Sequence, residues 1–262
     1  WSKKHRIMIL CGCLDPNHDL NESLERLSKD SRVVILTETT SNLSIKQGFP
    51  NIDNLLMQIN GEENYLPDLL ITLGRNVVSK KIKAFLSTIK TLEHWSFDTE
   101  KHSIDTFSHL TKKIKVEPSN VLKHFDISNE GNFKEDYQKL EYHPSTVRSR
   151  FIDQIEFCDF FAFDAVLKEI PKKSIIHFAN SSVVRYGNLF NLYSKNFYCF
   201  ANRGTSGIDG SSSTAVGYAT KSTDFNILIT GDVSFLYDSN AFWNKHLPSN
   251  LKIILINNGG GG

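Results

Sequence analysis

Several features that define large classes of protein are missing from this chain of 262 residues. No apolar run approaches the roughly 20 residues that span a bilayer, which argues against an integral membrane segment. An excess of one charge is also missing, because 30 basic and 29 acidic residues leave a net charge of +1. That balance argues against nucleic acid as a partner and against a polybasic membrane-surface role. The chain begins at Trp1 and has no charged-then-apolar leader, so we expect an excised piece of a longer, cytoplasmic protein.

Cysteine is scarce and histidine is not clustered. Cys11 and Cys13 end an apolar run, and Cys158 and Cys199 stand alone. A zinc site would need a second cysteine pair or histidines at ligand spacing, and the sequence has neither. We therefore expect buried or half-buried free thiols, as in a cytosolic protein.

The first half of the chain alternates short apolar runs with amphipathic segments. The apolar runs predict strands at 6–12, 32–39, 67–74, 92–97 and 113–117. The amphipathic segments predict helices at 20–30, 51–59 and 77–89, and a further helix starts at Pro118. Strands that alternate with helices predict an α/β fold with a doubly wound parallel sheet. We place this first domain at residues 1–125.

A polar stretch and then a second series of alternating elements follow. Residues 126–145 are interpreted as a linker that passes into a helix. Helical spacing continues to Ile170, with inward-facing positions expected at Phe151, Ile155, Cys158, Phe161, Phe163 and Leu167. Strands are then expected at 174–179, 197–201 and 225–231, with helices at 180–190 and 211–220. We place a second doubly wound α/β domain at residues 146–262.

The strongest functional signal lies between Phe225 and Gly262. One apolar run ends in Gly231-Asp232, a second ends in Asn257-Asn258, and the segment between them has helical spacing. This pattern predicts a strand, a crossover helix and a parallel strand, which bring both strand ends to one sheet edge. Asp232 and Asn258 would then supply hard oxygen ligands suited to Mg²⁺ and a diphosphate. Ordinary turn residues are the alternative, but the offset fits one crossover and four glycines follow.

Three further groups of residues are weaker candidates. The loop Asn202–Gly210 could place Arg203 and a helix start beside an anion, or could be an ordinary glycine-rich turn. Ser181 with Arg185 fits an anion site as well as it fits simple helix capping. Lys80 and Lys81, taken alone, fit a solvated helix face.

Four strings together resemble the thiamine-diphosphate enzymes. They are NSSVVR, NRGTSGIDG, GDVSFLYDSNA and NNGGGG. Within that family they are most similar to the branch of 2-succinyl-5-enolpyruvyl-6-hydroxy-3-cyclohexene-1-carboxylate synthases (SEPHCHC synthases) of menaquinone, or vitamin K2, biosynthesis. The resemblance is strong over 174–262 and weaker over the first domain, where LGRNVVSKK matches best. It implies a middle domain followed by a truncated diphosphate-binding domain, with Val233 where the general motif has a glycine.

The resemblance also implies roles for individual residues. Asp232, Asn258 and the Gly260 carbonyl would hold Mg²⁺ or Mn²⁺. The residues implied in binding thiamine diphosphate are Ser181, Ile208, Gly231, Asp232, Val233, Ser234 and Asn258, with Ile208 supporting the bent cofactor. Arg185 and Arg203 would meet the substrate carboxylates, and Lys80 and Lys81 would approach isochorismate. The implied transferase reaction decarboxylates 2-oxoglutarate on the thiazolium carbon and adds the succinyl carbanion equivalent to isochorismate.

The same resemblance sets limits on this segment. The family acts as a homodimer or homotetramer, and the glutamate that activates its cofactor lies in a domain outside this sequence. Residues 1–262 alone are therefore expected to be inactive. Two alternatives remain, namely another thiamine-diphosphate 2-oxoacid decarboxylase and a non-catalytic nucleotide-binding α/β module. The first strand ends in CGCLDPN, without the Gly-x-Gly-x-x-Gly that would favour the second.

Overall fold

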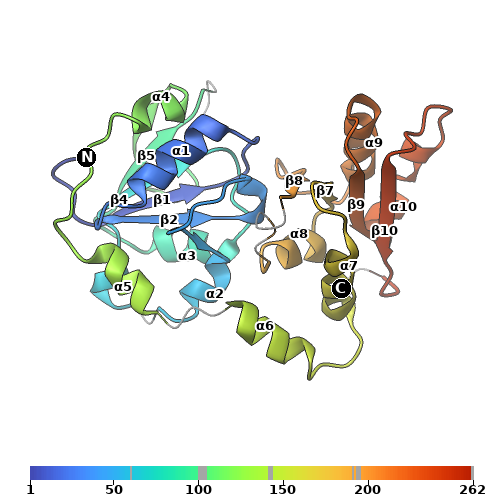
Figure 1. The fold of residues 1–262 in the computed structure, drawn as a ribbon, viewed down its shortest axis with the longest axis horizontal. Coiled ribbons are helices and arrows are strands. Elements are labelled where there is room, and N and C mark those ends of the chain that lie inside the picture. The colour runs from blue at the N-terminus through green and yellow to red at the C-terminus, as the bar shows by residue number, and fades with distance from the viewer. Residues whose placement is uncertain (60, 100–104, 141–143, 191, 193–195, 261–262) are drawn as a thin grey trace. The chain divides into compact units, whose positions relative to one another are not determined.

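A computed structural model describes residues 1–59, 61–99, 105–140, 144–190, 192 and 196–260. The chain divides into two compact units, unit 1 (Trp1–His143) and unit 2 (Pro144–Gly262). Each unit has one sheet in which all strand pairs are parallel, with helices connecting the strands (Figure 1). The predicted α/β class is therefore confirmed. Within the described residues, no helix is both long and apolar enough to cross a membrane.

Unit 1 contains a six-stranded sheet in the order β3-β2-β1-β4-β5-β6. Its strands are β1 (Ile7–Cys11), β2 (Val33–Thr37), β3 (Phe49–Pro50), β4 (Leu69–Leu73), β5 (Glu93–Phe97) and β6 (Leu110–Ile114). Its helices are α1 (His18–Leu27), α2 (Ile52–Leu56), α3 (Lys80–Ser87), α4 (Pro118–Leu122) and α5 (Phe133–Lys139). The strand expected at 113–117 ends at Ile114 instead, because Pro118 starts α4 after a short turn. The two-residue β3 is too short to give a periodic signal.

Two hydrophobic layers cover the two faces of this sheet. In β1, Ile7 and Ile9 pack on one side with leucines of α1, whereas Met8 and Leu10 pack on the other side with α2, α3 and α5. All five residues of β1 are buried. This alternation follows from the two-residue period of a strand, and burial on both faces explains why β1 reads as a continuous apolar run.

Unit 1 extends beyond the expected boundary at residue 125. Phe133 and Tyr137 of α5 are 1% and 0% exposed and belong to the same core cluster as Met8. The Tyr137 hydroxyl also donates to the Tyr65 carbonyl at 2.9 Å. The polar stretch from 126 therefore leads into a helix that packs on the first sheet, and this helix adds to the core of unit 1.

Burial of His94 gives unit 1 a predictable response to acid. His94 is 2% exposed, and burial lowers its pKa from 6.5 to about 4. The folded state then binds fewer protons than the unfolded state between these values, so stability is complete above pH 6.5 and falls as the pH drops toward 4. The loss reaches at most about 1.4 kcal/mol per pH unit. We expect His94→Gln to flatten the thermal-midpoint profile between pH 7.5 and 5. The exposed His18→Gln is the control, and an unchanged slope in the His94 variant would contradict the assignment.

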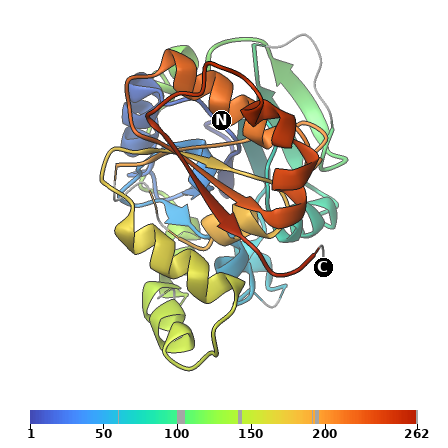
Figure 2. The same ribbon diagram turned by 90° about the vertical axis from the view of Figure 1, so that its right-hand side faces the viewer.

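Unit 2 contains a four-stranded sheet in the order β10-β9-β7-β8. Its strands are β7 (Ile175–Phe178), β8 (Tyr198–Ala201), β9 (Asn226–Gly231) and β10 (Leu251–Ile256). Its helices are α6 (Pro144–Ile152), α7 (Asp159–Glu169), α8 (Ser182–Gly187), α9 (Ser211–Lys221) and α10 (Asp232–Tyr237), with a 3-10 turn η4 (Ser239–Phe242). The predicted strand–helix–parallel strand at 225–256 is confirmed by the β9–β10 pairing. Figure 2 shows β10, in red, at the edge of this sheet.

The helix expected through 143–170 is interrupted in the structure. Residues 153–158 separate α6 from α7. Phe163 and Leu167 are buried as expected, but Phe151 is 51% exposed and Cys158 is exposed. Cys158 occupies the extended N-cap position of α7, outside the packing face of that helix. The expectation of inward packing was therefore wrong for Phe151 and Cys158, and that of a buried or half-buried thiol was wrong for Cys158.

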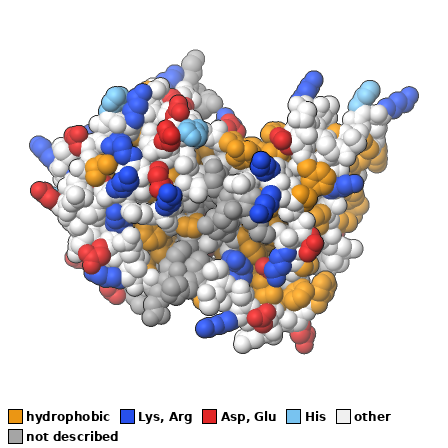
Figure 3. Space-filling view, viewed as in Figure 1, with side chains coloured by type: hydrophobic (Ala, Val, Ile, Leu, Met, Phe, Trp, Pro, Cys, Tyr) orange, Lys and Arg blue, Asp and Glu red, His pale blue; other side chains and the backbone are white. Residues whose placement is uncertain are grey.

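The crossover between β9 and β10 leaves apolar side chains at the surface. Leu236, Tyr237 and Trp243 are 71%, 71% and 82% exposed, and Ile253 and Leu255 of β10 are also exposed. Figure 3 shows hydrophobic side chains on the visible surface of unit 2. Parallel strands are usually buried on both faces, so the exposed side chains of β10 set this edge apart from the core strand β9.

Candidate functional site

The carboxyl ends of β9 and β10 bring the strongest candidates together. Ile256 pairs with Gly231 in the parallel register, so Asp232 and Asn257 are the next residues along the two strands. Asn258 follows one residue later. Asp232 is half-buried at the start of α10, and its Oδ1 accepts a hydrogen bond from the Val233 N–H at 2.8 Å. The parallel pairing of β9 and β10 therefore brings Asp232 and Asn258 to the same edge of the sheet, as the strand spacing predicted.

The oxygen donors at this edge fit a hard divalent cation. The Asn258 amide nitrogen donates to Oδ2 of Asp159 at 2.9 Å, which leaves the carboxamide oxygen as the end that can bind a metal. Gly260 has a φ of +140°, a conformation that a residue with a side chain rarely adopts. A carboxylate, a carboxamide oxygen and a backbone carbonyl are ligands that Mg²⁺ accepts while sharing its shell with phosphate oxygens. Gly261 and Gly262 lie outside the described residues.

The loop from Asn202 to Gly210 lies after β8 and carries two candidates. Arg203 is half-buried, and its Nη1 donates to Oδ1 of Asn180 at 2.7 Å. Ile208 is also half-buried, and its carbonyl accepts from the Ser234 hydroxyl at 2.6 Å. Ser234 belongs to α10, directly after Asp232 and Val233. The loop is therefore linked to the segment that carries the predicted metal ligand.

The start of α9 differs from the anion site that the sequence suggested. The carboxylate of Asp238 accepts from both the N–H and the hydroxyl of Ser213, at 2.7 and 2.6 Å. An acidic side chain thus already satisfies part of this helix N-terminus. Ser211 and Ser212 are buried, and their hydroxyls make no hydrogen bond with any described residue. Sequence reasoning missed Asp238 because its partner lies 25 residues earlier.

Ser181 and Arg185 lie on one short element after β7. Ser181 precedes α8 with a φ of +71°, and its side chain makes no capping hydrogen bond. A non-glycine residue in this region stores strain of about 1–3 kcal/mol, and such residues are concentrated at functional sites. Ser181 and Arg185 are both exposed. The alternative role that the sequence allowed for Ser181, capping of α8 by its side chain, does not occur.

Lys80 and Lys81 belong to unit 1, whereas the other candidates belong to unit 2. Both lysines are exposed in the first turn of α3. Ser79 caps this helix by accepting from the Ile82 N–H at 3.1 Å. The buried carboxylate of Glu38 accepts from the Val78 and Ser79 N–H groups, each at 2.7 Å. Glu38 therefore fixes the backbone that leads into the two lysines.

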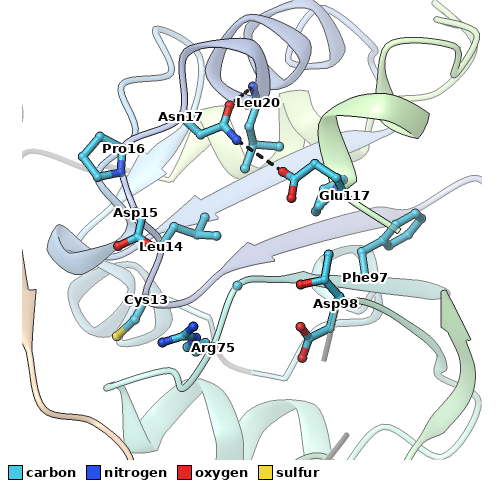
Figure 4. Close-up of a pocket in the computed structure, with 13 residues that line it drawn as sticks. Cys13, Leu14, Asp15, Pro16, Asn17, Leu20, Arg75, Phe97, Asp98 and Glu117 are labelled. Atoms are coloured by element: carbon cyan, nitrogen blue, oxygen red, sulfur yellow. Dashed lines mark hydrogen bonds between the residues drawn. The ribbon is translucent and has the colours of Figure 1, made fainter. Parts of the chain in front are cut away.

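Unit 1 also has a cavity of about 230 Å³ that sequence reasoning missed (Figure 4). It lies at the carboxyl ends of β1, β4 and β5, where the order of the sheet reverses between β1 and β4. Open α/β sheets commonly bind ligands at such a point. Its charged lining consists of Asp15, Asp98, Glu117 and Arg75. Three carboxylates against one guanidinium disfavour a polyphosphate here.

Comparisons with known proteins agree with these features. The family model described as "Middle domain of thiamine pyrophosphate" matches residues 1–174. The chain is similar to 2-succinyl-5-enolpyruvyl-6-hydroxy-3-cyclohexene-1-carboxylate synthases, with 43% identity to that of Flavobacterium psychrophilum and 41% to that of Flavobacterium johnsoniae. Each alignment covers 100% of this chain and 48% of the relative. The synthase of Porphyromonas gingivalis is 34% identical over 98% of this chain and 46% of its own length.

The chain thus spans about half the length of the curated relatives that it matches. The family model covers most of the chain, including all of unit 1. The parallel sheets agree with the α/β domains that the sequence resemblance implied. The chain therefore belongs to the thiamine pyrophosphate enzyme family.

Proposed function

We propose that the full-length protein containing this chain is a thiamine-diphosphate-dependent SEPHCHC synthase of menaquinone biosynthesis. It would decarboxylate 2-oxoglutarate and transfer the remaining four-carbon unit to isochorismate. The observation that carries the proposal is the parallel β9–β10 pair, whose ends place Asp232 and Asn258 at one sheet edge. The similarity to synthases of that name at 34–43% identity supports the same activity.

The metal and cofactor would be held mainly by unit 2. Asp232, Asn258 and the Gly260 carbonyl would bind Mg²⁺ or Mn²⁺ on the diphosphate. The cofactor-binding residues of the proposal are Ser181, Ile208, Gly231, Asp232, Val233, Ser234 and Asn258. Bound thiamine diphosphate supplies the electron sink that decarboxylation of a 2-oxoacid requires. The Ser234 hydroxyl fixes the carbonyl of Ile208, which keeps that side chain in place as a support for the cofactor.

Cationic side chains would bind the anionic substrates. Arg185 and Arg203 would contact the carboxylates of 2-oxoglutarate, since a guanidinium can pair with a carboxylate through two hydrogen bonds. Lys80 would approach isochorismate, with Lys81 beside it on the same helix turn. An arginine that binds a carboxylate equally in the ground state and the transition state lowers KM without raising kcat.

The assembly and location of the protein are part of the same proposal. We expect a homodimer or homotetramer in the cytoplasm, with 2-oxoglutarate and isochorismate as small-molecule partners and no nucleic acid. About half of each relative's length lies outside the match, so residues 1–262 alone are expected to lack activity.

A non-catalytic nucleotide-binding module is the less favoured function. Its best location would be the cavity of unit 1, but the carboxylates of Asp15, Asp98 and Glu117 line that cavity. Repulsion between these groups and a polyphosphate argues against this alternative.

An assay with substrate omission tests the proposal. The full-length protein, with thiamine diphosphate and Mg²⁺, is supplied with 2-oxoglutarate, isochorismate or both, and products are identified by mass spectrometry. We expect the condensed product only with both substrates, and none from residues 1–262 alone. Pyruvate in place of 2-oxoglutarate is the control for a general 2-oxoacid decarboxylase. Faster turnover of pyruvate than of 2-oxoglutarate would overturn the assignment.

A further inference from the structure

Asn180 occupies a central position among the candidate residues of unit 2. It follows β7 directly after Ala179, whose N–H donates to the Ile229 carbonyl of β9 at 2.9 Å. Asn180 therefore lies close to the sheet, and the residue is only 2% exposed. None of the site roles proposed above uses Asn180.

All three polar functions of the Asn180 carboxamide contact the loop Asn202–Gly210. Its Nδ2 donates to the Asn202 carbonyl at 2.7 Å and to the Gly207 carbonyl at 2.6 Å. Its Oδ1 accepts from Nη1 of Arg203 at 2.7 Å. The two carbonyls lie on either side of Arg203–Ser206, so one side chain closes the base of this loop and holds the guanidinium that projects from it.

Hydrogen bonds from side chains to backbone carbonyls hold the loop Asn202–Gly210, which has no β-strand of its own. Asn202 donates from its own Nδ2 to the Gly210 carbonyl at 3.0 Å, and Ser234 binds the Ile208 carbonyl. Gly204, Thr205 and Ser206 at the tip are exposed. Because the tip has little burial to order it, the hydrogen bonds at its base determine its conformation.

The chemistry of a carboxamide suits an anion-binding arginine. An asparagine oxygen accepts a hydrogen bond from a guanidinium without neutralising its charge, which is the charge that a substrate carboxylate would pair with. An aspartate at this position would pair with Arg203 ionically and compete with that carboxylate. It would also lose both N–H donors and leave two loop carbonyls without them.

We propose that Asn180 is a positioning residue that anchors loop 202–210 to the sheet and orients the Arg203 guanidinium toward a carboxylate of the substrate. This inference rests on the proposed function for the identity of that substrate. The anchoring of the loop is independent of the substrate and can be measured without turnover.

The test compares Asn180→Asp with the matched control Asn250→Asp in the full-length protein. Asn250 also donates to backbone carbonyls, those of Ala219, Ser222 and Asp224, but it lies beside the amino end of β10, away from the strand ends that carry Asp232 and Asn258. We expect Asn180→Asp to raise the KM for 2-oxoglutarate about tenfold, with kcat within about threefold of wild type. Asn250→Asp should change neither value more than about twofold.

In an Arg203→Met background, Asn180→Asp should change KM by less than about threefold, because coupled residues are non-additive.

Hydrogen exchange supplies the readout that needs no activity. We expect amides of 202–210 to exchange about tenfold faster in Asn180→Asp, while β7 and β9 stay unchanged. Asn180→Ser, which adds no charge, should show the same faster exchange with a smaller rise in KM, and it serves if the aspartate variant fails to fold. Unchanged exchange in 202–210, or an equal rise in KM with and without Arg203, would overturn the proposal. If the wild type does not turn over 2-oxoglutarate, the proposed function fails, and the exchange result alone then decides whether Asn180 anchors the loop.

Discussion

Replacing Asp232 with alanine in the full-length protein is expected to lower synthase activity about 1,000-fold. Asp232 follows β9 directly and is the only carboxylate in the proposed metal set of Asp232, Asn258 and Gly260. Loss of this carboxylate weakens binding of the metal that would hold the diphosphate, and about 4 kcal/mol of lost stabilisation corresponds to 1,000-fold, because each loss of about 1.4 kcal/mol is tenfold. The rate is measured with saturating 2-oxoglutarate and isochorismate over a range of Mg²⁺ concentrations.

The control for this prediction is Asp224→Ala. Asp224 is exposed and precedes β9, so it lies at the opposite end of the same strand. We expect Asp224→Ala to retain activity within about twofold. If Asp232→Ala also kept more than about a tenth of wild-type activity at low Mg²⁺, the metal assignment would be wrong.

The second large effect concerns stability, and it arises from the buried pair of Asp30 and Arg32. Asp30 is 0% exposed and accepts from Nε and Nη2 of Arg32 at 3.0 and 2.7 Å. It also accepts from the Ser128 N–H at 2.9 Å. Asp30→Ala would leave the Arg32 guanidinium buried without its carboxylate. We expect it to destabilise unit 1 by about 3–5 kcal/mol.

Hydrogen exchange of β1 and β2 amides measures this loss, because their slowest exchange reports opening of unit 1. The comparison is Glu135→Ala, which removes an exposed ion pair with Lys139 and should cost less than about 1 kcal/mol. Equal protection of the β1 and β2 amides in the two variants would contradict the predicted loss of stability in Asp30→Ala. Faster exchange of the Ser128 amide in Asp30→Ala would also show that Asp30 holds the segment after residue 125 against the rest of unit 1.

Patterns of short range in the sequence were sufficient to predict most of the fold. The apolar runs of β1, β2, β4 and β9 are buried on both faces, so their signal was strong and their parallel pairing is confirmed. The limits of β6 and the break between α6 and α7 were not predicted. They depend on packing and on local turns, which hydrophobic spacing does not report.

The residues of the candidate site could be predicted from the sequence, but the hydrogen bonds that hold them in place could not. Gly231 ends β9, and Asp232 and Asn258 follow the paired strands β9 and β10, so topology alone indicated that these residues converge. The hydrogen bonds of Asn180, Asp238 and Ser234 join residues 22 to 27 positions apart in sequence and carry no local pattern. Their existence could be found only from the folded chain.

The proposed function depends on a divalent metal at the ends of β9 and β10 that holds the diphosphate of the cofactor. Electron–nuclear double resonance of the full-length protein with Mn²⁺ and thiamine diphosphate tests it most directly. We expect one bound Mn²⁺ per chain with resolved ³¹P coupling, and loss of that coupling in Asp232→Ala but not in Asp224→Ala. Mn²⁺ that stays hydrated in the wild type, or ³¹P coupling that persists without the Asp232 carboxylate, would contradict it.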